Sequence, residues 1–249
     1  MKQLAKKIRR RILKASYEAG ACHIGSALSC VEILIALYFE VMKPEDIFVF
    51  SKASGVAALY SILAEKGVIP EDKVAYYLKK YPLPSKEVPG IDVNAGSLGL
   101  VLSVAVGRAW GRKLKGKKGK VYCLVSDGEL DSGNNWEAIL FAAHNKLDNL
   151  IVIVDYNKHQ ACGRTNEVLN LEPLDKKWSS FGWVVQEIDG HNLEKLKKLD
   201  FPIMNSVPTC IIAHTIKGKG VSFMEDKTEW HYNNLDKEQY EKAIRENSN

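Results

Sequence analysis

The sequence predicts an α/β fold of three layers, in which a mainly parallel β-sheet carries helices on both faces. Short apolar runs rich in β-branched residues alternate along the chain with segments of helical periodicity, which is typical of strand–helix–strand units. Several of these runs end in Asp, Asn or Gly, as strands do where they reach a ligand-binding edge. The chain has no internal repeat or low-complexity segment, and its length allows one large domain or two small ones.

The first part of the chain is expected to be mostly helical. Lys2–Glu18 has an amphipathic helical pattern, and Ser29 followed by Glu32 has the spacing of a capping box, with Ser29 as the N-cap. The segment Tyr81–Ala95 contains three prolines and little periodicity, which is typical of a long active-site loop. The elements expected here are helices at Lys2–Glu18, Ser29–Val41, Val56–Lys66 and Glu71–Lys80 and a strand at Asp46–Phe50.

Strands and helices alternate in the rest of the chain. Gly96–Gly99 opens an apolar helix at Leu100–Arg112, whose small residues suggest close packing. Apolar runs beginning at Val121 and Leu150 flank a helix-periodic segment and predict a strand–helix–strand unit with a right-handed crossover. The remaining elements are expected to be strands at Trp183–Ile188 and Pro208–Ala213, a helix from Leu193, a polar segment at Lys217–Asn234 and a charged terminal helix.

Composition argues against several classes of function. The net charge is +5, and the basic run Arg112–Lys120 has no aromatic stacking partners, so a solvated connection is favoured over a nucleic-acid site. No apolar run is long enough to span a bilayer and no signal-peptide core is present, so we expect a cytoplasmic protein with no membrane partner. The five cysteines are scattered without a C-x-x-C pair, which favours neither a disulfide framework nor a zinc site.

Asp127 and Asn157 follow two apolar runs that are expected to be neighbouring parallel strands. Ligands bind at the carboxyl ends of such strands, so the two side chains would emerge together. One carboxylate and one amide suit Mg²⁺ or Ca²⁺, and Mg²⁺ usually takes phosphate oxygens and water at its other positions. Each motif alone is typical of an ordinary turn, but together they predict a diphosphate carried on a metal ion.

Two other features accompany this pair. The turn Gly96–Gly99 at a helix start could offer backbone N–H groups to a phosphate, although, taken alone, it favours a helix N-terminus that only packs against the sheet. His23, His191 and His231 lie in turns or at strand ends that could face the same cleft, whereas His144 lies on the crossover helix and is expected on the surface or in packing.

These pieces, in this order, resemble the N-terminal, thiamine-diphosphate-binding half of transketolase, and more specifically the separate N-terminal subunit of a split transketolase. The resemblance covers nearly the whole chain, and it implies that residues 1–249 form a single diphosphate-binding domain. It rests on Cys22–Ser29, Gly90–Val93, Gly96–Gly99, Ser126–Leu130, Trp136–Ala138, Lys146–Leu150, Asp155–Asn157, Asp189–His191 and Lys217–Glu225.

The resemblance implies roles for individual residues. Asp127 and Asn157 would bind Mg²⁺, with Ca²⁺ or Mn²⁺ as alternatives, together with the main-chain carbonyl of His159. His23 and His231 would line the substrate channel and act in proton traffic around the sugar hydroxyls. The residues implied to contact thiamine diphosphate are Ser54, Gly96, Ser97, Leu98, Asp127, Gly128, Asn157, His159 and His191.

The resemblance also implies a missing half. In this family the Glu that activates the cofactor lies in a pyrimidine-binding domain, and no second α/β block follows here. That domain and the C-terminal domain are therefore expected on a partner chain, in a heterotetramer acting on sugars or sugar phosphates.

The chain departs from the family pattern around the substrate. A His is replaced by Ser54, a second His by Leu83, and an interface Glu by Ser132. These losses leave metal binding intact and predict an unusual substrate for a ketol-transferring enzyme. Two alternatives remain open: a subunit of a thiamine-diphosphate enzyme that decarboxylates or ligates 2-oxo acids, and a non-catalytic remnant that binds or regulates.

Overall fold

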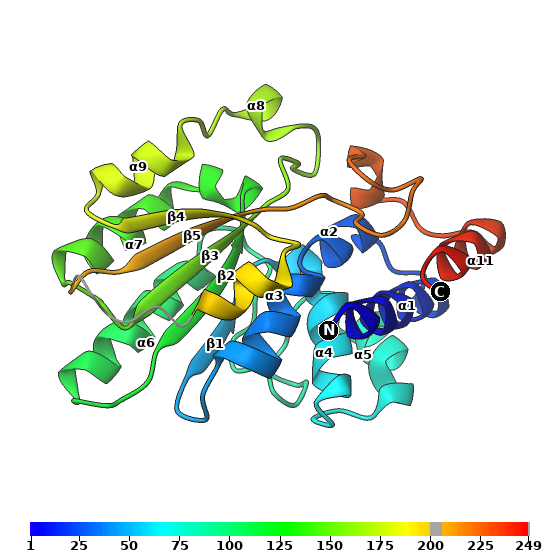
Figure 1. Cartoon of the computed structure of the whole chain (residues 1–249), viewed down its shortest axis with the longest axis horizontal. Coiled ribbons are helices and arrows are strands. Elements are labelled where there is room, and N and C mark those ends of the chain that lie inside the picture. Colours follow the sequence, from blue (N-terminus) through cyan, green and yellow to red (C-terminus); the bar gives the residue numbers. More distant parts are fainter. Residues whose placement is uncertain (200–205, 249) are drawn as a thin grey trace.

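The centre of the protein is a parallel sheet of five strands in the order β1-β2-β3-β5-β4 (Figure 1). The structure is a computed structural model and describes residues 1–199 and 206–248. The strands are β1 (Ile47–Phe50), β2 (Val121–Ser126), β3 (Leu150–Tyr156), β4 (Val184–Asp189) and β5 (Thr209–His214). Because all pairs are parallel, all the carboxyl ends lie at one edge of the sheet.

Helices cover both faces of this sheet, as Figure 1 shows. One face carries α1 (Lys2–Ala19), α2 (Ile24–Ser29), α3 (Val31–Ala36), α4 (Val56–Glu65), α5 (Val74–Lys80), α10 (Leu193–Leu196) and α11 (Lys237–Glu246). The other carries α6 (Val101–Leu114), α7 (Gly133–His144) and α9 (Leu174–Ser180). The short helix α8 (Thr165–Val168) lies in the connection between β3 and α9.

Alternate residues of the central strands enter two separate cores. In β2, Tyr122 and Leu124 pack with the helices of the α1 side, while Cys123 and Val125 pack with α6 and α7. Both sides are buried, which explains why β2 and β3 are continuous apolar runs without polar alternation. The predicted three-layer α/β class is therefore confirmed.

Most elements lie where the sequence predicted them, but the capping box at Ser29 is wrong. Ser29 is the last residue of α2, not an N-cap, and its hydroxyl donates to the carbonyl of Ser26 and to the carboxylate of Asp155. Glu32 instead pairs with Arg9. The single helix expected at Ser29–Val41 is divided into the end of α2, then α3 and a π-helical turn at Leu37–Val41.

The region after β3 was not predicted to contain helices. α8 and α9 have four and seven residues, too few to show a clear helical period. The buried side chain of Trp178 on α9 packs against Trp183 with ring centroids 4.8 Å apart, which holds this segment on the α6–α7 side. Within the described residues, no helix is long and apolar enough to cross a membrane.

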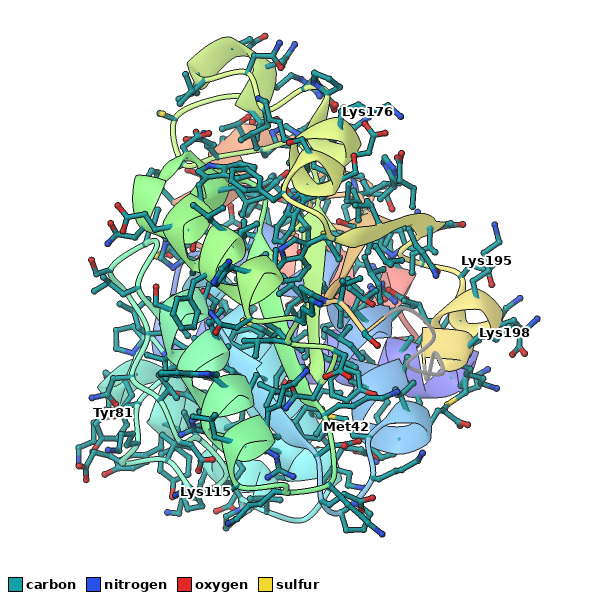
Figure 2. All side chains as sticks on the ribbon, turned by 90° about the vertical axis from the view of Figure 1, so that its left-hand side faces the viewer. Met42, Tyr81, Lys115, Lys176, Lys195 and Lys198 are labelled. Atoms are coloured by element: carbon teal, nitrogen blue, oxygen red, sulfur yellow. The ribbon has the colours of Figure 1, made fainter. Side chains whose placement is uncertain are left out.

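Figure 2 looks onto the α6–α7 side of the molecule. Lys115, just after α6, and Lys176, on α9, lie at opposite ends of this view. Between them α6 and α7 expose large apolar side chains, among them Val104, Leu114 and Leu140.

Candidate active site

A cavity of about 270 Å³ lies at the carboxyl ends of β1, β2 and β3. The topology produces it, because the three parallel strands deliver the loops that follow them to one edge. Of the residues predicted from the sequence, its lining contains His23, Ser54, Gly96, Leu98, Gly128, His159 and His231. Residues more than 200 positions apart in the chain are thus brought together.

Asp127 and Asn157 lie directly behind this lining, each immediately after its strand. Both are buried, with exposed fractions of 0% and 3%. The carboxylate of Asp127 accepts hydrogen bonds from the backbone N–H of Gly128 at 2.9 Å and of Lys158 at 2.5 Å. Since Lys158 is the residue after Asn157, the second bond joins the two strand ends directly, as the sequence had predicted.

Asp155 and Lys52 form a buried ion pair beside these residues, and neither was predicted as a site residue. Their charged atoms are 3.0 Å apart, and both side chains are at most 1% exposed. The carboxylate of Asp155 also accepts hydrogen bonds from the hydroxyls of Ser29 and Thr215. A single side chain thereby ties the end of β3 to α2 and to the segments that follow β1 and β5.

Glu129 is a further buried acid that sequence reasoning missed. It lines the cavity, is 1% exposed, and accepts a hydrogen bond from the backbone N–H of Ser126 at 3.1 Å. Burial raises the pKa of Glu129, and separately that of Asp127, to about 7. The available signal was its position two residues after Asp127, at the same strand end.

The two predicted catalytic histidines lie side by side. The rings of His23 and His231 are 4.7 Å apart, edge to face, and the backbone N–H of His23 donates to the carbonyl of His231. Burial lowers the pKa of both imidazoles, with the nearby ammonium of Lys217 as the next cause, and that of His231 falls to about 3. Both are therefore neutral near pH 7.

Lys217 fixes the tautomer of the neutral His231 ring. Its ammonium is buried and lies 3.1 Å from Nδ1 of His231. An ammonium can only donate, so Nδ1 accepts and the proton of the neutral ring is on Nε2. Burial lowers the pKa of Lys217 to about 8, with Lys52 as the next cause.

Hydrogen bonds hold the ring of His159 beside the cavity, whereas the ring of His191 is bonded to residues outside the cavity lining. The ring of His159 contacts Thr228 and Asp226 through its two nitrogens, and its backbone N–H donates to the side-chain oxygen of Asn157 at 3.0 Å. His191 is not part of the cavity lining. Its Nε2 accepts from the N–H of Ile216, so its Nδ1 donates to Glu32 at 2.9 Å.

The turn before α6 approaches the cavity from the opposite wall. Gly96 and Leu98 line the cavity, while Ser97 is exposed and does not. Gly99 has φ +85°, and a Cβ there would lie 2.6 Å from the Cβ of Ser132, so the turn requires glycine at this point. Ser54 and Leu83, which depart from the family pattern, both line the cavity.

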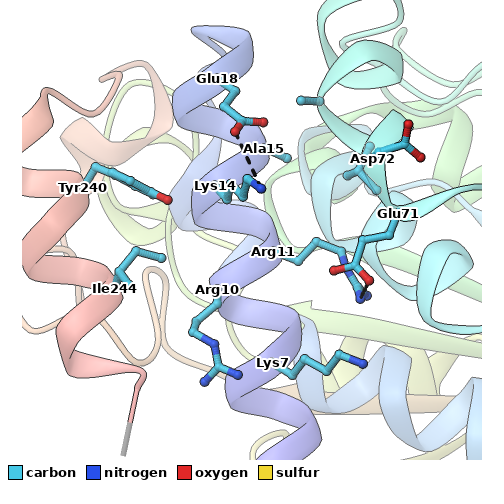
Figure 3. A pocket seen from close by; sticks show the side chains of 12 residues that line it. Lys7, Arg10, Arg11, Lys14, Ala15, Glu18, Glu71, Asp72, Tyr240 and Ile244 are labelled. Atoms are coloured by element: carbon cyan, nitrogen blue, oxygen red, sulfur yellow. Dashed lines mark hydrogen bonds and ion pairs between the residues drawn. The ribbon is translucent and has the colours of Figure 1, made fainter.

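A larger hollow lies elsewhere, between α1, α5 and α11 (Figure 3). Its volume is about 790 Å³, and Lys7, Arg10, Arg11 and Lys14 line it. Each of these cations already has a partner within the protein, for example Arg11 with Glu71 at 2.9 Å and Lys14 with Glu18 at 3.8 Å. We therefore place the candidate site at the strand ends, despite the difference in size.

The residues at the strand ends fit a metal-bound diphosphate. Asp127 is a buried carboxylate with only backbone donors on its oxygens, and Asn157 adds an amide oxygen beside it. No group of three His, Cys, Asp or Glu side chains forms a metal site within residues 1–199 and 206–248. The predicted metal site does not require such a group, since its ligands are one carboxylate, one amide and one main-chain carbonyl, which are ligand types of Mg²⁺.

The family described as transketolase, thiamine diphosphate binding domain, matches residues 1–247 of this sequence. The chain belongs to this family. It is 44% identical to one of the subunits of the apulose-4-phosphate transketolase of Actinobacillus succinogenes, over 99% of this chain and 95% of that protein. It is 40% identical to the 6-deoxy-6-sulfo-D-fructose transketolase subunit SqwG of Clostridium sp. strain MSTE9, over 96% of this chain and 93% of that protein.

A solved structure supports the same family. Transketolase from Campylobacter jejuni superimposes with a TM-score of 0.89 at 26% identity, covering 99% of this chain and 42% of that chain. The transketolase-family domain described here therefore spans about two fifths of that enzyme. The resemblance predicted from the sequence is confirmed at the level of family and fold, whereas the roles of single site residues stay predictions.

We predict that Lys52→Met destabilises the protein by about 3–5 kcal/mol, because the buried carboxylate of Asp155 loses its counter-charge. Lys113→Met is the matched control. It removes an exposed pair with Asp148 and should cost less than about 1 kcal/mol. Urea unfolding measures both values. The double variant Lys52→Met/Asp155→Leu should recover much of the loss, and equal costs for the two single variants would contradict the account.

We also predict that His231 stays neutral from pH 5 to pH 8, because burial beside Lys217 lowers its pKa to about 3. Imidazole NMR on protein with labelled histidine measures this, with the exposed His144 as comparison. Lys217→Met should raise the pKa of His231. Because the unfolded chain binds the proton more readily, His231 should also lower stability as the pH falls from about 6.5 towards 3. A wild-type titration near pH 6.5 would refute the assignment.

Proposed function

We propose that this chain is the N-terminal subunit of a thiamine-diphosphate- and Mg²⁺-dependent transketolase that transfers a ketol unit between sugar phosphates. The observation that carries the proposal is the pairing of Asp127 and Asn157 at adjacent strand ends, behind a cavity lined by His23 and His231. The two relatives that are 44% and 40% identical to this chain are named as subunits of transketolases, which supports ketol transfer over 2-oxo acid chemistry.

The chain's part of the reaction is to hold the cofactor and manage protons. Asp127, Asn157 and the carbonyl of His159 would hold Mg²⁺, and Gly128 and the turn at Gly96 would let backbone N–H groups approach the diphosphate. Thiamine diphosphate, when bound, supplies the nucleophilic carbon and the electron sink for cleaving a C–C bond beside a carbonyl.

Proton handling falls to the neutral imidazole pair. Since Lys217 donates to Nδ1 of His231, the Nε2–H of His231 is available to donate to a sugar oxygen. His23 is also neutral near pH 7 and can accept a proton from a sugar hydroxyl, which is the role of a general base. The two rings therefore offer one donor and one acceptor to neighbouring substrate oxygens.

The substrate is proposed to be non-standard for the family. Ser54 and Leu83 line the cavity at positions where the family pattern has imidazoles, so two potential hydrogen-bonding groups are absent from its wall. A site built without these groups discriminates strongly against substrates that need them. The substrates named for the two relatives, apulose 4-phosphate and 6-deoxy-6-sulfo-D-fructose, are modified sugars and are the first donors to try.

A partner subunit carrying the catalytic Glu is proposed to dock on α6 and α7, in a heterotetramer. Leu100, just before α6, and Val104 and Leu114 on α6 follow helical spacing, and each is at least 40% exposed. Gly107 and Gly111 share this stripe, and a Cβ at either would meet no atom within 4 Å, so another backbone can approach closely. Leu98 extends this stripe and also lines the cavity, so a partner docked on the stripe would lie beside the proposed cofactor site.

Val104→Glu should abolish association with the C-terminal subunit, because it places a charge in the centre of the apolar stripe. Lys115→Glu introduces the same side chain at the exposed end of α6 and should leave association intact. Co-purification of tagged chain and partner measures both. Equal recovery of the partner with the two variants would show that the partner docks elsewhere.

We expect the co-expressed complex to bind thiamine diphosphate with Mg²⁺ and to transfer a ketol unit. Asp127→Ala removes a proposed metal ligand and should lower both the affinity for the cofactor and the rate of ketol transfer by at least about 100-fold. Calorimetric titration and a coupled ketol-transfer assay measure these. Asp148→Ala, on the surface at the opposite end of the sheet, is the control. Tight binding without turnover of any donor would favour a regulatory remnant, and absence of binding would overturn the proposal.

A further inference from the structure

A second cavity, of about 180 Å³, lies beside the first. The linings of the two cavities share His23 and Ser54. The loop that follows α5 contributes to both, since Leu83 lines the first cavity and Pro82 the second. His23 and Ser54 therefore lie at the boundary between the two cavities, and the neighbouring residues Pro82 and Leu83 each line one of them.

Ser54 is the smallest of the residues at this boundary. It is half-buried, and it stands where the family pattern has a histidine, whose ring would occupy the space that serine leaves open. Each cavity alone is below the roughly 300 Å³ at which small-molecule sites begin, but the two together exceed it. A ligand that used both spaces would lie against Ser54, because Ser54 lines each of them.

Resting on the proposed function, we propose that the second cavity is a subsite for a side arm of a branched ketose, and that Ser54 is the residue that determines this specificity. The shared lining residues give the reason. His23 lines both cavities and is proposed to contact a sugar hydroxyl, so a group in the second cavity would be attached close to the reacting carbons and not at the far end of the sugar.

The walls of the second cavity are small and mostly apolar, with one charged group among them, which suits a short arm that carries its polar group at the tip. Gly20, Ala21 and Ala57 leave room, and no acidic residue is among the lining residues that the structure describes. Of these same residues, Lys79 alone carries a full charge, and it is exposed at the edge, so a hydroxymethyl or phosphorylated arm would meet an ammonium group there. A straight-chain ketose has no group to place in this space.

The test compares two donors in the complex with the C-terminal subunit: apulose 4-phosphate, which has a branched carbon skeleton, and xylulose 5-phosphate, which has none. Ser54→His should raise the KM for the branched donor at least about tenfold relative to the straight-chain donor. Ala21→Leu narrows the second cavity from its other wall and should shift the ratio in the same direction. Ser54→Ala keeps the space open and should leave the ratio between the donors as in the wild type.

The outcomes separate this inference from the proposed function. Turnover with equal effects of Ser54→His on both donors would overturn the inference and leave the function standing. If neither donor is turned over, the function fails, and amide NMR on the full chain still tests the subsite. Apulose 4-phosphate should then shift the amide signals of Ala21 and Ala57, and Ala21→Leu should abolish these shifts; unchanged signals would overturn the inference.

Discussion

The buried ion pair between Lys52 and Asp155 is the interaction on which the rest of the site depends. Asp155 lies near the end of a central strand and holds, through one carboxylate, the end of α2, the segment after β1 and the residue after β5. Isolated buried charges are expensive, so this arrangement is stable only as a complete set. It fixes the strand ends from which Asp127 and Asn157 project, and both Lys52 and Asp155 act electrostatically on Asp127.

The same network explains how one site can combine a metal-bound anion with neutral imidazoles. The carboxyl groups of Asp127, Glu129 and Asp155 lie at the ends of β2 and β3, where a divalent cation would balance negative charge. Lys217 lies between this acidic group and the histidine pair. It interacts electrostatically with Asp127 and Asp155, and its ammonium contacts His231. Acidic side chains, lysines and neutral imidazoles thus follow one another from the proposed cofactor site to the proposed substrate site.

The sequence was sufficient for features that follow local pattern or parallel-strand geometry. The fold class and the meeting of Asp127 with Asn157 are of this kind, because apolar runs mark strands and parallel strands share an edge. The sequence was insufficient where contacts between distant residues determine the role of a side chain. Ser29 has the spacing of a cap, but its hydroxyl binds a carboxylate 126 positions away. His191 follows a strand end as expected, yet both nitrogens of its ring form hydrogen bonds with Glu32 and Ile216. Lys52 gave no local signal, since its role depends entirely on Asp155.

The central claim is that one metal ion sits between Asp127, Asn157 and the carbonyl of His159 and carries the diphosphate of the cofactor. The most direct measurement is a crystal structure of the chain with its C-terminal subunit, thiamine diphosphate and Mn²⁺, with data collected for the anomalous signal of manganese. The account predicts a peak about 2.0–2.3 Å from one oxygen of each residue and beside the diphosphate. A peak elsewhere, or cofactor bound with no metal between these residues, would contradict it.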